Sequence, residues 1–217
     1  RSGDWSSGRV LFRSETVGIT KFCIHPAEWF QSKTRVGGTK HIHADRIQSL
    51  QPDLIIANKE ENVREQVASL AADYPVWLTD VTTLPDACTM IREIGSLTHR
   101  SQLAGTLAHS IEQSFAAYQP NQQRTAAYLI WREPYMTVGA DTFIHDLMAR
   151  AGLINVFAHL NRYPVITVTD IRNRQPDALL LSSEPYPFAE KHIQELKQAL
   201  PHTAIHLVDG ELFSWYG

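Results

Sequence analysis

The sequence lacks a basic charge balance, a long apolar run and a set of cysteines, and each absence excludes a class of protein. Its net charge of -3 argues against non-specific nucleic-acid binding, because that requires a basic surface. No apolar stretch approaches the roughly 18–20 residues that a membrane-spanning helix needs. The cysteines are Cys23 and Cys88, which are too few for a disulfide framework and do not form a Cys-x-x-Cys pair.

Common catalytic and nucleotide-binding motifs are also missing. The patterns Gly-x-x-x-x-Gly-Lys-Ser/Thr, Gly-x-Gly-x-x-Gly and Gly-x-Ser-x-Gly do not occur. Cys23 and His25 are too close in sequence to form a convincing nucleophile and base without a third, orienting group. We therefore do not expect an enzyme.

The first fourteen residues differ from the rest. Residues 4–7 (Asp-Trp-Ser-Ser) and 9–14 (Arg-Val-Leu-Phe-Arg-Ser) resemble translations, in two reading frames, of a common sequencing-adapter oligonucleotide. A short natural strand over residues 10–12 is the alternative. We expect segment 1–14 to be non-native and exclude it from fold reasoning as one would a tag. A genomic match through these residues would overturn that expectation.

From Glu15 onward, strand-like and helix-like segments alternate, which predicts an α/β fold with mainly parallel sheets. Short apolar or β-branched runs predict strands at residues 16–20, 54–57, 75–78, 125–130 and 178–181. Helical spacing predicts helices at residues 45–50, 63–72 and 86–97.

One long segment, residues 99–118, has the pattern of a single continuous helix. Leu103, Leu107, Ile111 and Phe115 recur every four residues and would form one apolar stripe. At 1.5 Å per residue such a helix spans about 30 Å, the width of a small domain. A second series of strands and helices follows it.

The two series resemble each other. Five residues recur 124 positions later: Ile47, Gln51, Pro52, Asp53 and Glu60 return as Ile171, Gln175, Pro176, Asp177 and Glu184. A Pro-Asp pair after a helix is common in α/β proteins, but five identities in matching context favour a duplication. We therefore predict two Rossmann-like lobes with parallel sheets, joined by one long backbone helix.

Motifs on both sides of the long helix resemble those of a known family. Residues 46–57, Arg-Ile-Gln-Ser-Leu-Gln-Pro-Asp-Leu-Ile-Ile-Ala, are similar to a helix and Pro-Asp-Leu-hydrophobic signature. That signature belongs to the periplasmic-binding-protein family that serves iron-siderophore and cobalamin importers. Gly139, residues 142–147 (Thr-Phe-Ile-His-Asp-Leu) and residues 151–156 (Ala-Gly-Leu-Ile-Asn-Val) resemble the family's second-lobe signature. The chain is thus identified as a member of the helical-backbone metal-receptor type.

The resemblance implies a solute-binding protein of an ABC importer, which captures a metal chelate between its two lobes. A ferric siderophore, cobalamin or haem would be the cargo, and no resident cofactor is expected. It further implies an ABC-transporter permease as partner, a monomeric state and a periplasmic or cell-envelope location. A receptor for a free transition-metal ion is the second-ranked ligand class. A chelatase-like tetrapyrrole enzyme is the alternative from another functional class.

The same resemblance sets the expected domain limits. We place an N-terminal α/β lobe at residues 15–98, a spine helix at 99–119 and a C-terminal α/β lobe at 120–217. Relative to the family order, a first strand and the C-terminal helices are missing. We therefore expect both lobes to be incomplete and any signal peptide to lie outside this sequence.

Ligands of parallel α/β sheets bind beyond the carboxyl ends of the strands. In the first lobe these ends carry Lys21, Phe22, Thr39, Lys40, Asn58 and Lys59. In the second lobe the candidates are Trp131, Arg132, Tyr135, Arg162, Tyr163 and Trp215. A single charged strand end is more often an ordinary loop residue, but cations at five separate ends favour a site. Aromatic rings beside cations suit a large, flat ligand that carries negative charge.

Two smaller sets of candidates complete the prediction. Cys23 and His25 could ligate a metal from one side of an extended segment, but no further ligands follow at zinc-site spacing. The family resemblance also implies one permease-docking glutamate on each lobe. The candidates are Glu61, Glu65, Glu184 and Glu190. Carboxylates that merely favour helix N-termini are the alternative interpretation.

Overall fold

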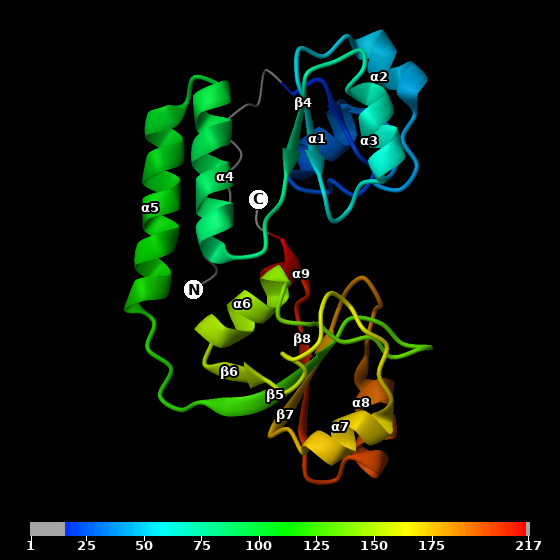
Figure 1. Cartoon of the computed structure of the whole chain (residues 1–217), viewed down its shortest axis with the longest axis vertical. Coiled ribbons are helices and arrows are strands. Elements are labelled where there is room, and N and C mark those ends of the chain that lie inside the picture. The colour runs from blue at the N-terminus through cyan, green and yellow to red at the C-terminus, as the bar shows by residue number, and fades with distance from the viewer. Residues whose placement is uncertain (1–15, 216–217) are drawn as a thin grey trace. The chain divides into compact units, whose positions relative to one another are not determined.

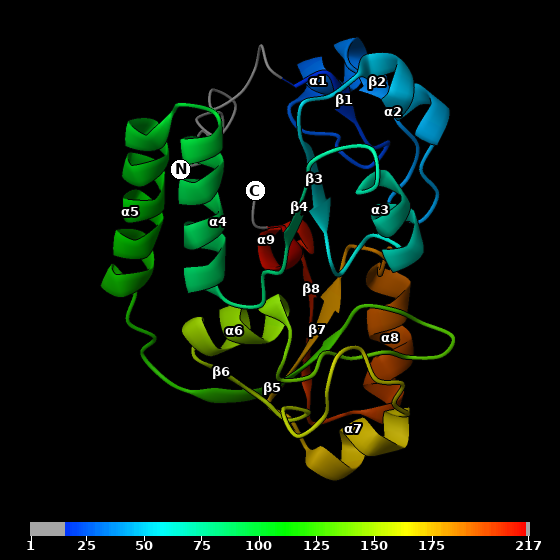
Figure 2. The same cartoon turned by 45° about the horizontal axis from the view of Figure 1, so that its top comes forward.

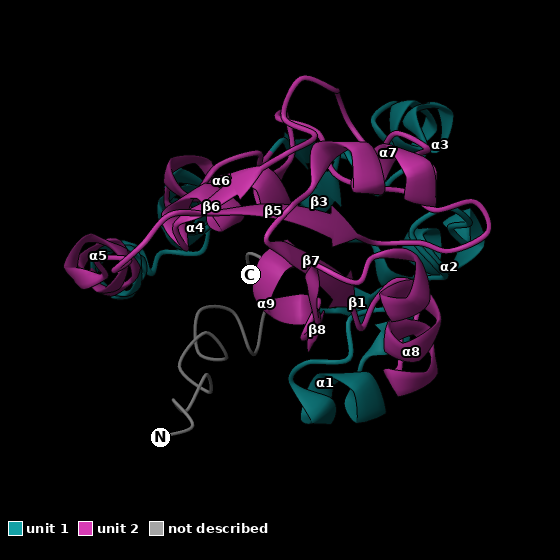
Figure 3. Ribbon diagram, turned by 90° about the horizontal axis from the view of Figure 1, so that it is seen from below, with its two compact units in different colours: residues 1–80, 89–109 teal, residues 81–88, 110–217 magenta. Residues whose placement is uncertain are grey.

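Strands and helices alternate through residues 16–215, which a computed structural model describes. These residues divide into two units, which are coloured separately in Figure 3. Unit 1 comprises described residues 16–80 and 89–109, and unit 2 comprises 81–88 and 110–215. The segment predicted to be non-native, residues 1–14, lies outside the described residues.

Unit 1 contains two pairs of parallel strands and three short helices (Figure 1). In chain order they are β1 Gly18–Ile19, α1 Ala27–Ser32, β2 Thr34–Arg35, α2 Ala44–Leu50, β3 Ile55–Asn58, α3 Arg64–Leu70 and β4 Val76–Thr79. β1 pairs with β2, and β3 pairs with β4. Ile47 of α2, Ala57 of β3 and Leu70 of α3 are buried, so each of these elements contributes an apolar residue to the interior.

Unit 2 is built on one four-stranded sheet (Figures 1 and 2). Its elements are β5 Arg124–Leu129, α6 Phe143–Arg150, β6 Leu153–Asn155, α7 Val168–Arg174, β7 Ala178–Ser182, α8 Glu190–Ala199, β8 Ala204–Val208 and α9 Glu211–Ser214. The strand order is β6-β5-β7-β8, and every neighbouring pair is parallel. The predicted parallel sheet is therefore confirmed.

Side-chain alternation along β5 and β7 explains how unit 2 buries both faces of its sheet. On one face the buried cluster contains Ala127, Leu129, Leu179 and Leu181 with Ile171 of α7 and Leu196 of α8. On the other face it contains Ala126, Tyr128, Ala178 and Leu180 with Ile144 and Met148 of α6. Helices thus cover a sheet that is apolar on both sides.

Two longer helices, α4 Leu84–Leu97 and α5 Ser101–Ala117, contribute residues to both units. The predicted long helix is observed as α5, and its most buried residues are two alanines that lie beside the predicted leucine positions in the apolar stripe. Ala104 and Ala108 are fully buried, whereas Leu103 is 39% exposed. A Cβ on Gly95 of α4 would lie only 2.2 Å from the Cβ of Ala104, so small residues allow a close approach. Within residues 16–215, no helix has the length and apolarity required to cross a membrane.

The two segments that carry the repeated residues share local structure, as a duplication predicts. α2 ends at Gln51 with φ 44° and ψ 59°, and α7 ends at Gln175 with φ 47° and ψ 53°. This left-handed conformation is uncommon for a residue with a side chain. Ile47 and Ile171 occupy equivalent helix positions, and both are buried. Each copy therefore has the same order of helix, left-handed glutamine, Pro-Asp and parallel strand.

Candidate functional site

In unit 1, the carboxyl ends of β1 and β2 lead into loops that contact each other. The backbone N–H of Lys21 donates to the carbonyl of Gly37 over 2.8 Å. The Lys21 Nζ lies 4.9 Å from the centre of the Phe22 ring, and the phenyl group is 52% exposed. A Cβ on Gly38 would lie 3.1 Å from Lys21 Cε and 3.3 Å from Phe22 Cε2. The predicted pair Lys21 and Phe22 therefore forms an accessible cation–π surface beside the Gly-Gly turn.

The loops that follow β2 and β3 also meet. Thr39 Oγ1 donates to Glu61 Oε2 over 3.4 Å, and Lys40 Nζ lies 3.9 Å from the same oxygen. Lys40 also donates to the backbone carbonyl of Glu60 over 3.2 Å. Glu61, a candidate docking residue, thus lies beside two candidate ligand residues.

Asn58 shapes the loop after β3. Its Oδ1 accepts hydrogen bonds from the backbone N–H groups of Glu60 at 2.8 Å and Glu61 at 3.0 Å. Its own backbone N–H donates to Asn62 Oδ1 over 2.8 Å. These contacts give Asn58 a structural role, while its contact with a ligand stays a prediction.

Lys59 and the Cys23–His25 pair form separate arrangements. The Lys59 ammonium pairs with Asp80 at the end of β4. Cys23 Sγ contacts the backbone carbonyl of His25 at 3.5 Å, and burial raises the pKa of the Cys23 thiol. A raised pKa opposes metal binding, because the thiolate is the ligand. Among the described residues, no group of three His, Cys, Asp or Glu side chains could hold a metal ion.

In unit 2, the strand order places a crossover point between β5 and β7, where open parallel sheets bind ligands. Trp131 follows β5 and is 40% exposed. Its ring meets Tyr186, in the loop after β7, edge-on with centroids 5.7 Å apart. The backbone N–H of Tyr186 donates to the carbonyl of Ile130 over 3.3 Å. The sequence does not predict Tyr186 as a site residue, because it lies two positions after Glu184, the last candidate at the end of this strand.

Glu184 and Trp215 are joined at the same edge of the sheet. Glu184 Oε1 accepts hydrogen bonds from Trp215 Nε1 and, over 2.9 Å, from Ser214 Oγ. A Cβ on Gly210 would lie 2.5 Å from Glu184 Cγ, so the close approach requires glycine there. A candidate docking carboxylate therefore orients a candidate ligand-binding ring.

The buried Tyr128 supports this edge of the sheet from the core. Its hydroxyl donates to Ser182 Oγ over 3.1 Å, and Ser182 in turn donates to the backbone carbonyl of Glu184. Burial, together with the charges of Glu184 and Asp209, raises the pKa of Tyr128 to about 12. The phenol thus stays neutral and serves as a hydrogen-bond donor within the core.

Arg132 is held by unit 2's own acidic residues. Its Nη2 donates to both carboxylate oxygens of Glu195 at 2.9 and 3.0 Å, and its Nη1 lies 2.9 Å from Glu133. Hydrogen bonds to Tyr135, Glu195 and Tyr186 raise the pKa of Arg132. The charge of Arg132, which is predicted to contact the ligand, is therefore already paired with two carboxylates of unit 2.

Arg162 and Tyr163 lie on a loop that runs beside Tyr135. Backbone hydrogen bonds join Gly139 N–H to the Arg162 carbonyl at 2.7 Å and Ile166 N–H to the Tyr135 carbonyl at 2.9 Å. The guanidinium carbon of Arg162 lies 5.6 Å from the centre of the Tyr163 ring. The structure therefore brings these three predicted residues onto adjacent segments.

The remaining docking candidates are exposed and lie at helix starts. Glu65 is in the first turn of α3, and Glu190 is the first residue of α8. Both positions favour a carboxylate through the helix dipole alone. Their contact with a permease stays a prediction.

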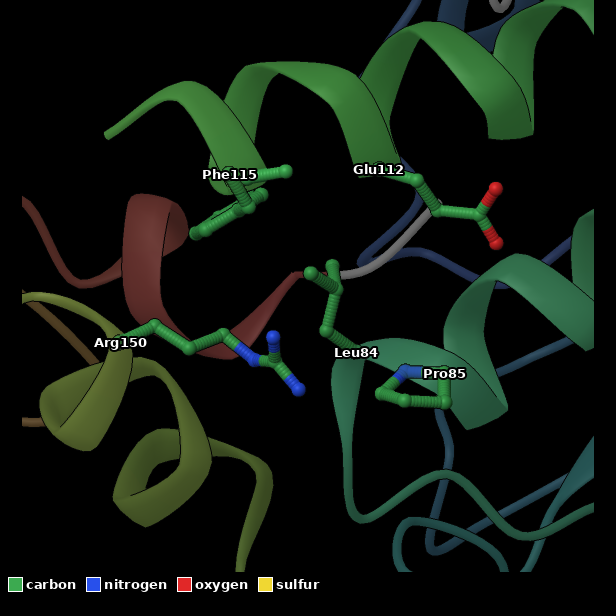
Figure 4. A pocket seen from close by; sticks show the side chains of 6 residues that line it. Leu84, Pro85, Glu112, Phe115 and Arg150 are labelled. Atoms are coloured by element: carbon green, nitrogen blue, oxygen red, sulfur yellow. The ribbon is translucent and has the colours of Figure 1, made fainter. Parts of the chain in front are cut away.

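Two pockets of the described residues are lined by residues other than the predicted ones. One, of about 200 Å³, is lined by Leu84, Pro85, Glu112, Phe115 and Arg150 (Figure 4). Its volume falls below the roughly 300–1,000 Å³ of sites for drug-sized ligands. Another, of about 460 Å³, surrounds the turn between α4 and α5, from His99 to Thr106. Neither contains a predicted site residue.

Comparison with known proteins adds sequence and structural relatives. A family profile described as "Periplasmic binding protein" matches residues 13–203. The vitamin B12-binding protein of Salmonella typhi is 22% identical over 174 residues, which cover 77% of this chain and 65% of that protein. Its counterpart in Vibrio cholerae serotype O1 is 22% identical over 84% of this chain and 67% of its own. The chain therefore spans about two thirds of the length of these relatives.

Solved structures show a shared fold. The periplasmic vitamin B12 binding protein BtuF of Vibrio cholerae has a TM-score of 0.74 at 19% identity, covering 91% of this chain and 80% of its own. The periplasmic haem binding protein HutB of Vibrio cholerae has a TM-score of 0.78 at 19% identity, covering 98% and 90%. An Fe3+-hydroxamate transport protein from Saccharomonospora viridis has a TM-score of 0.66 at 21% identity, covering 94% and 83%. These relatives have the predicted two-lobed α/β architecture.

Proposed function

Because this chain belongs to the periplasmic binding protein family, we propose that it is the solute-binding component of an ABC importer and captures a metal chelate. The observation that supports this most directly is the set of aromatic rings at the carboxyl ends of the parallel strands. Phe22 is 52% exposed in unit 1, and Trp131 is 40% exposed in unit 2. The protein binds and releases its cargo without making or breaking a bond in it.

The charge pattern favours a flat, ring-bearing chelate such as a corrinoid or haem. Lys40, Lys59 and Arg132 each contact a carboxylate, from Glu61, Asp80 and Glu195 respectively. With three of the five candidate cations in contact with carboxylates, ring stacking and hydrogen bonding should contribute more to binding than net positive charge. A strongly anionic ferric siderophore would find fewer uncompensated charges there, and it is the alternative cargo.

A receptor for a free metal ion and a chelatase are the rival functions. The described residues contain no group of three potential metal ligands, which weighs against the first. The family's relatives are binding proteins, which weighs against the second. We further propose a periplasmic location, a monomer and a permease partner. Glu61, Glu65, Glu184 and Glu190 are its candidate contacts.

Equilibrium titration tests the ligand class. The purified protein is titrated separately with cyanocobalamin, haemin, ferrichrome and zinc chloride, with tryptophan fluorescence and native mass spectrometry as readouts. We expect a one-to-one complex with cyanocobalamin or haemin and no metal insertion when protoporphyrin and metal are supplied together. Tight binding of zinc alone would support the ion receptor, and metalloporphyrin product would support the chelatase.

Two substitutions test the location of the site. Trp131→Ala and Trp215→Ala should each weaken binding about tenfold, since stacked aromatic contacts contribute roughly 0.5–1.5 kcal/mol beyond the area that they bury. Tyr118→Ala is the matched control, because Tyr118 is an aromatic residue that is 54% exposed and lies just after α5. Equal affinity in all three variants would overturn the placement of the site at the strand ends.

A further inference from the structure

The side chain of Gln66 clamps the backbone of the loop that carries Thr39 and Lys40. Its Nε2 donates to the carbonyl of Lys40 over 2.9 Å, and its Oε1 accepts from the N–H of Ile42 over 3.0 Å. One amide thus satisfies a donor and an acceptor two residues apart, as a neighbouring β-strand would.

Asn62 makes a second link from the same segment. Its Nδ2 donates to the carbonyl of Thr39 over 3.1 Å, while its Oδ1 accepts from the backbone N–H of Asn58 over 2.8 Å. Asn62 therefore connects the loop after β2 to the end of β3. Asn62 comes directly before Val63, the N-cap of α3, and Gln66 lies in the first turn of the helix, so both amides reach the loop from the start of α3.

The loop also closes on itself, because the N–H of Gly38 donates to the carbonyl of His41 over 2.8 Å, and the two amides add to this restraint. The loop contains two adjacent glycines, and Gly37 has a φ of 110°, a conformation that favours glycine. A Cβ on Gly37 would lie 2.4 Å from the carbonyl oxygen of His41, so glycine is needed for the turn to close. The freedom that glycine introduces must be restrained if Thr39 and Lys40 are to hold one position.

We infer that Asn62 and Gln66 are positioning residues, whose side-chain amides hold Thr39 and Lys40 in place for ligand contact at the end of β3. The inference rests on the proposed ligand-binding function. Both amides are neutral and half-buried, and each uses its oxygen and nitrogen in a single orientation. A carboxylate of the same shape can accept a hydrogen bond but cannot donate one.

Graded substitutions of Gln66 test the clamp. Gln66→Glu loses donation to Lys40, and Gln66→Met loses both contacts. We expect cyanocobalamin or haemin affinity to fall about threefold and about tenfold respectively, as one and then two net hydrogen bonds are lost. Gln48→Met is the matched control, because Gln48 is an exposed glutamine on α2, and it should leave affinity unchanged.

A pH profile and hydrogen exchange separate positioning from general destabilisation. In Gln66→Glu, affinity relative to the wild type should recover as pH falls towards a glutamate pKa of about 4.3, since a protonated carboxyl can again donate. Amide hydrogen exchange should accelerate at residues 38–42 in Gln66→Met, with little change in unit 2. Unchanged exchange would show that Gln66 does not restrain the loop. Faster exchange with unchanged affinity would show that the restraint has no role in ligand binding.

Failure of the proposed cargo and failure of the positioning role give different results. If the wild-type protein binds neither cyanocobalamin nor haemin, the proposed cargo is wrong and the ligand-positioning role falls with it. The exchange measurement still decides whether the amides hold the loop. If the wild type binds and Gln66→Met binds equally well, only the positioning role is overturned.

Discussion

The two units share a local helix-to-strand motif, but they differ in how completely the strand of that motif is buried. In both, a helix ends at a left-handed glutamine and passes through Pro-Asp into a parallel strand. All five residues of β7 are buried, whereas Ala57 is the buried residue of β3. β7 lies between β5 and β8, whereas within residues 16–215 β3 pairs with β4 and with no other strand. The local motif therefore specifies the turn and the strand, and flanking strands determine whether that strand becomes core.

The largest expected effect comes from truncating matched strand positions. Leu180 of β7 is 7% exposed, whereas Ile56, its equivalent in β3, is 47% exposed. Leu180→Ala should reduce the free energy of unfolding by about 2–5 kcal/mol, since it leaves a cavity in a packed core. Ile56→Ala should cost less than about 1 kcal/mol, because much of that side chain is already in water.

Hydrogen exchange resolved by unit is the appropriate measurement, since a chain with two units need not unfold in one step. Leu180→Ala should raise exchange in β5, β7 and β8. Equal costs for the two substitutions would show that β3 is covered in the protein to the same degree as β7.

A smaller contrast is expected between two predicted ligand cations. Arg132 contacts both oxygens of Glu195, and its side chain is 24% exposed, whereas Lys40 lies 3.9 Å from Glu61 with 57% exposure. Arg132→Ala should destabilise unit 2 by about 1–2 kcal/mol, because the charged hydrogen bonds from Nη2 to Glu195 are lost. Lys40→Ala should change stability by less than about 0.5 kcal/mol. Urea denaturation of both variants measures these changes. Similar stabilities would show that the contacts of Arg132 with Glu195 contribute little to stability, which would leave ligand contact as its predicted role.

The stability of unit 2 should also depend on the protonation of His192. Burial lowers the pKa of His192, and its Nδ1 accepts the backbone N–H of Ala189 over 2.9 Å. The folded state therefore favours the neutral ring. As pH falls through the ordinary value of 6.5, the unfolded chain gains a proton that the folded state resists, so stability declines.

His192→Gln tests this dependence, because its amide oxygen can accept the same N–H without titrating. The variant should lose less stability than the wild type between about pH 7.5 and pH 5.5. Thermal denaturation at several pH values provides the measurement. Parallel pH profiles for the two proteins would assign the acid sensitivity to another group.

The smallest effect concerns the repeated left-handed glutamines. Gln51→Gly and Gln175→Gly should each stabilise the protein by up to about 1 kcal/mol, since glycine removes the steric cost of a left-handed backbone. Because the two φ values are 44° and 47°, the gains should be similar. Melting temperatures of the two variants would test this, and a gain at only one site would show that side-chain contacts of the other glutamine matter.

These comparisons also show what sequence can and cannot predict. The helix, strand and repeat assignments depend on local spacing, and the structure confirms α2, β3, α3 and β7 near their expected places. β1 is confined to Gly18–Ile19, and the sequence does not predict the two-residue β2, because such short strands leave no alternation to detect.

Contacts between distant residues account for most of what the sequence could not predict at the candidate site. The pairing of Arg132 with Glu195 joins residues 63 positions apart, and no local pattern announces it. Asn62 and Gln66 could not be predicted from the sequence, because neutral amides around the start of a short helix resemble ordinary surface residues. Their four-residue spacing directly after a strand-end loop is the one signal that could have drawn attention to them.

Because α4 and α5 each contain residues of both units, cleavage of the chain within them should affect folding. Residues 81–88 belong to unit 2, although residues 89–109 of unit 1 follow them in the chain. Within unit 2, the N–H of Leu84 donates to Asp146 over 2.8 Å. A single cleavage in α5 would leave Leu84 and Asp146 on different fragments. Unit 2 would then be divided between the two fragments, so it should retain its fold only while both pieces stay associated.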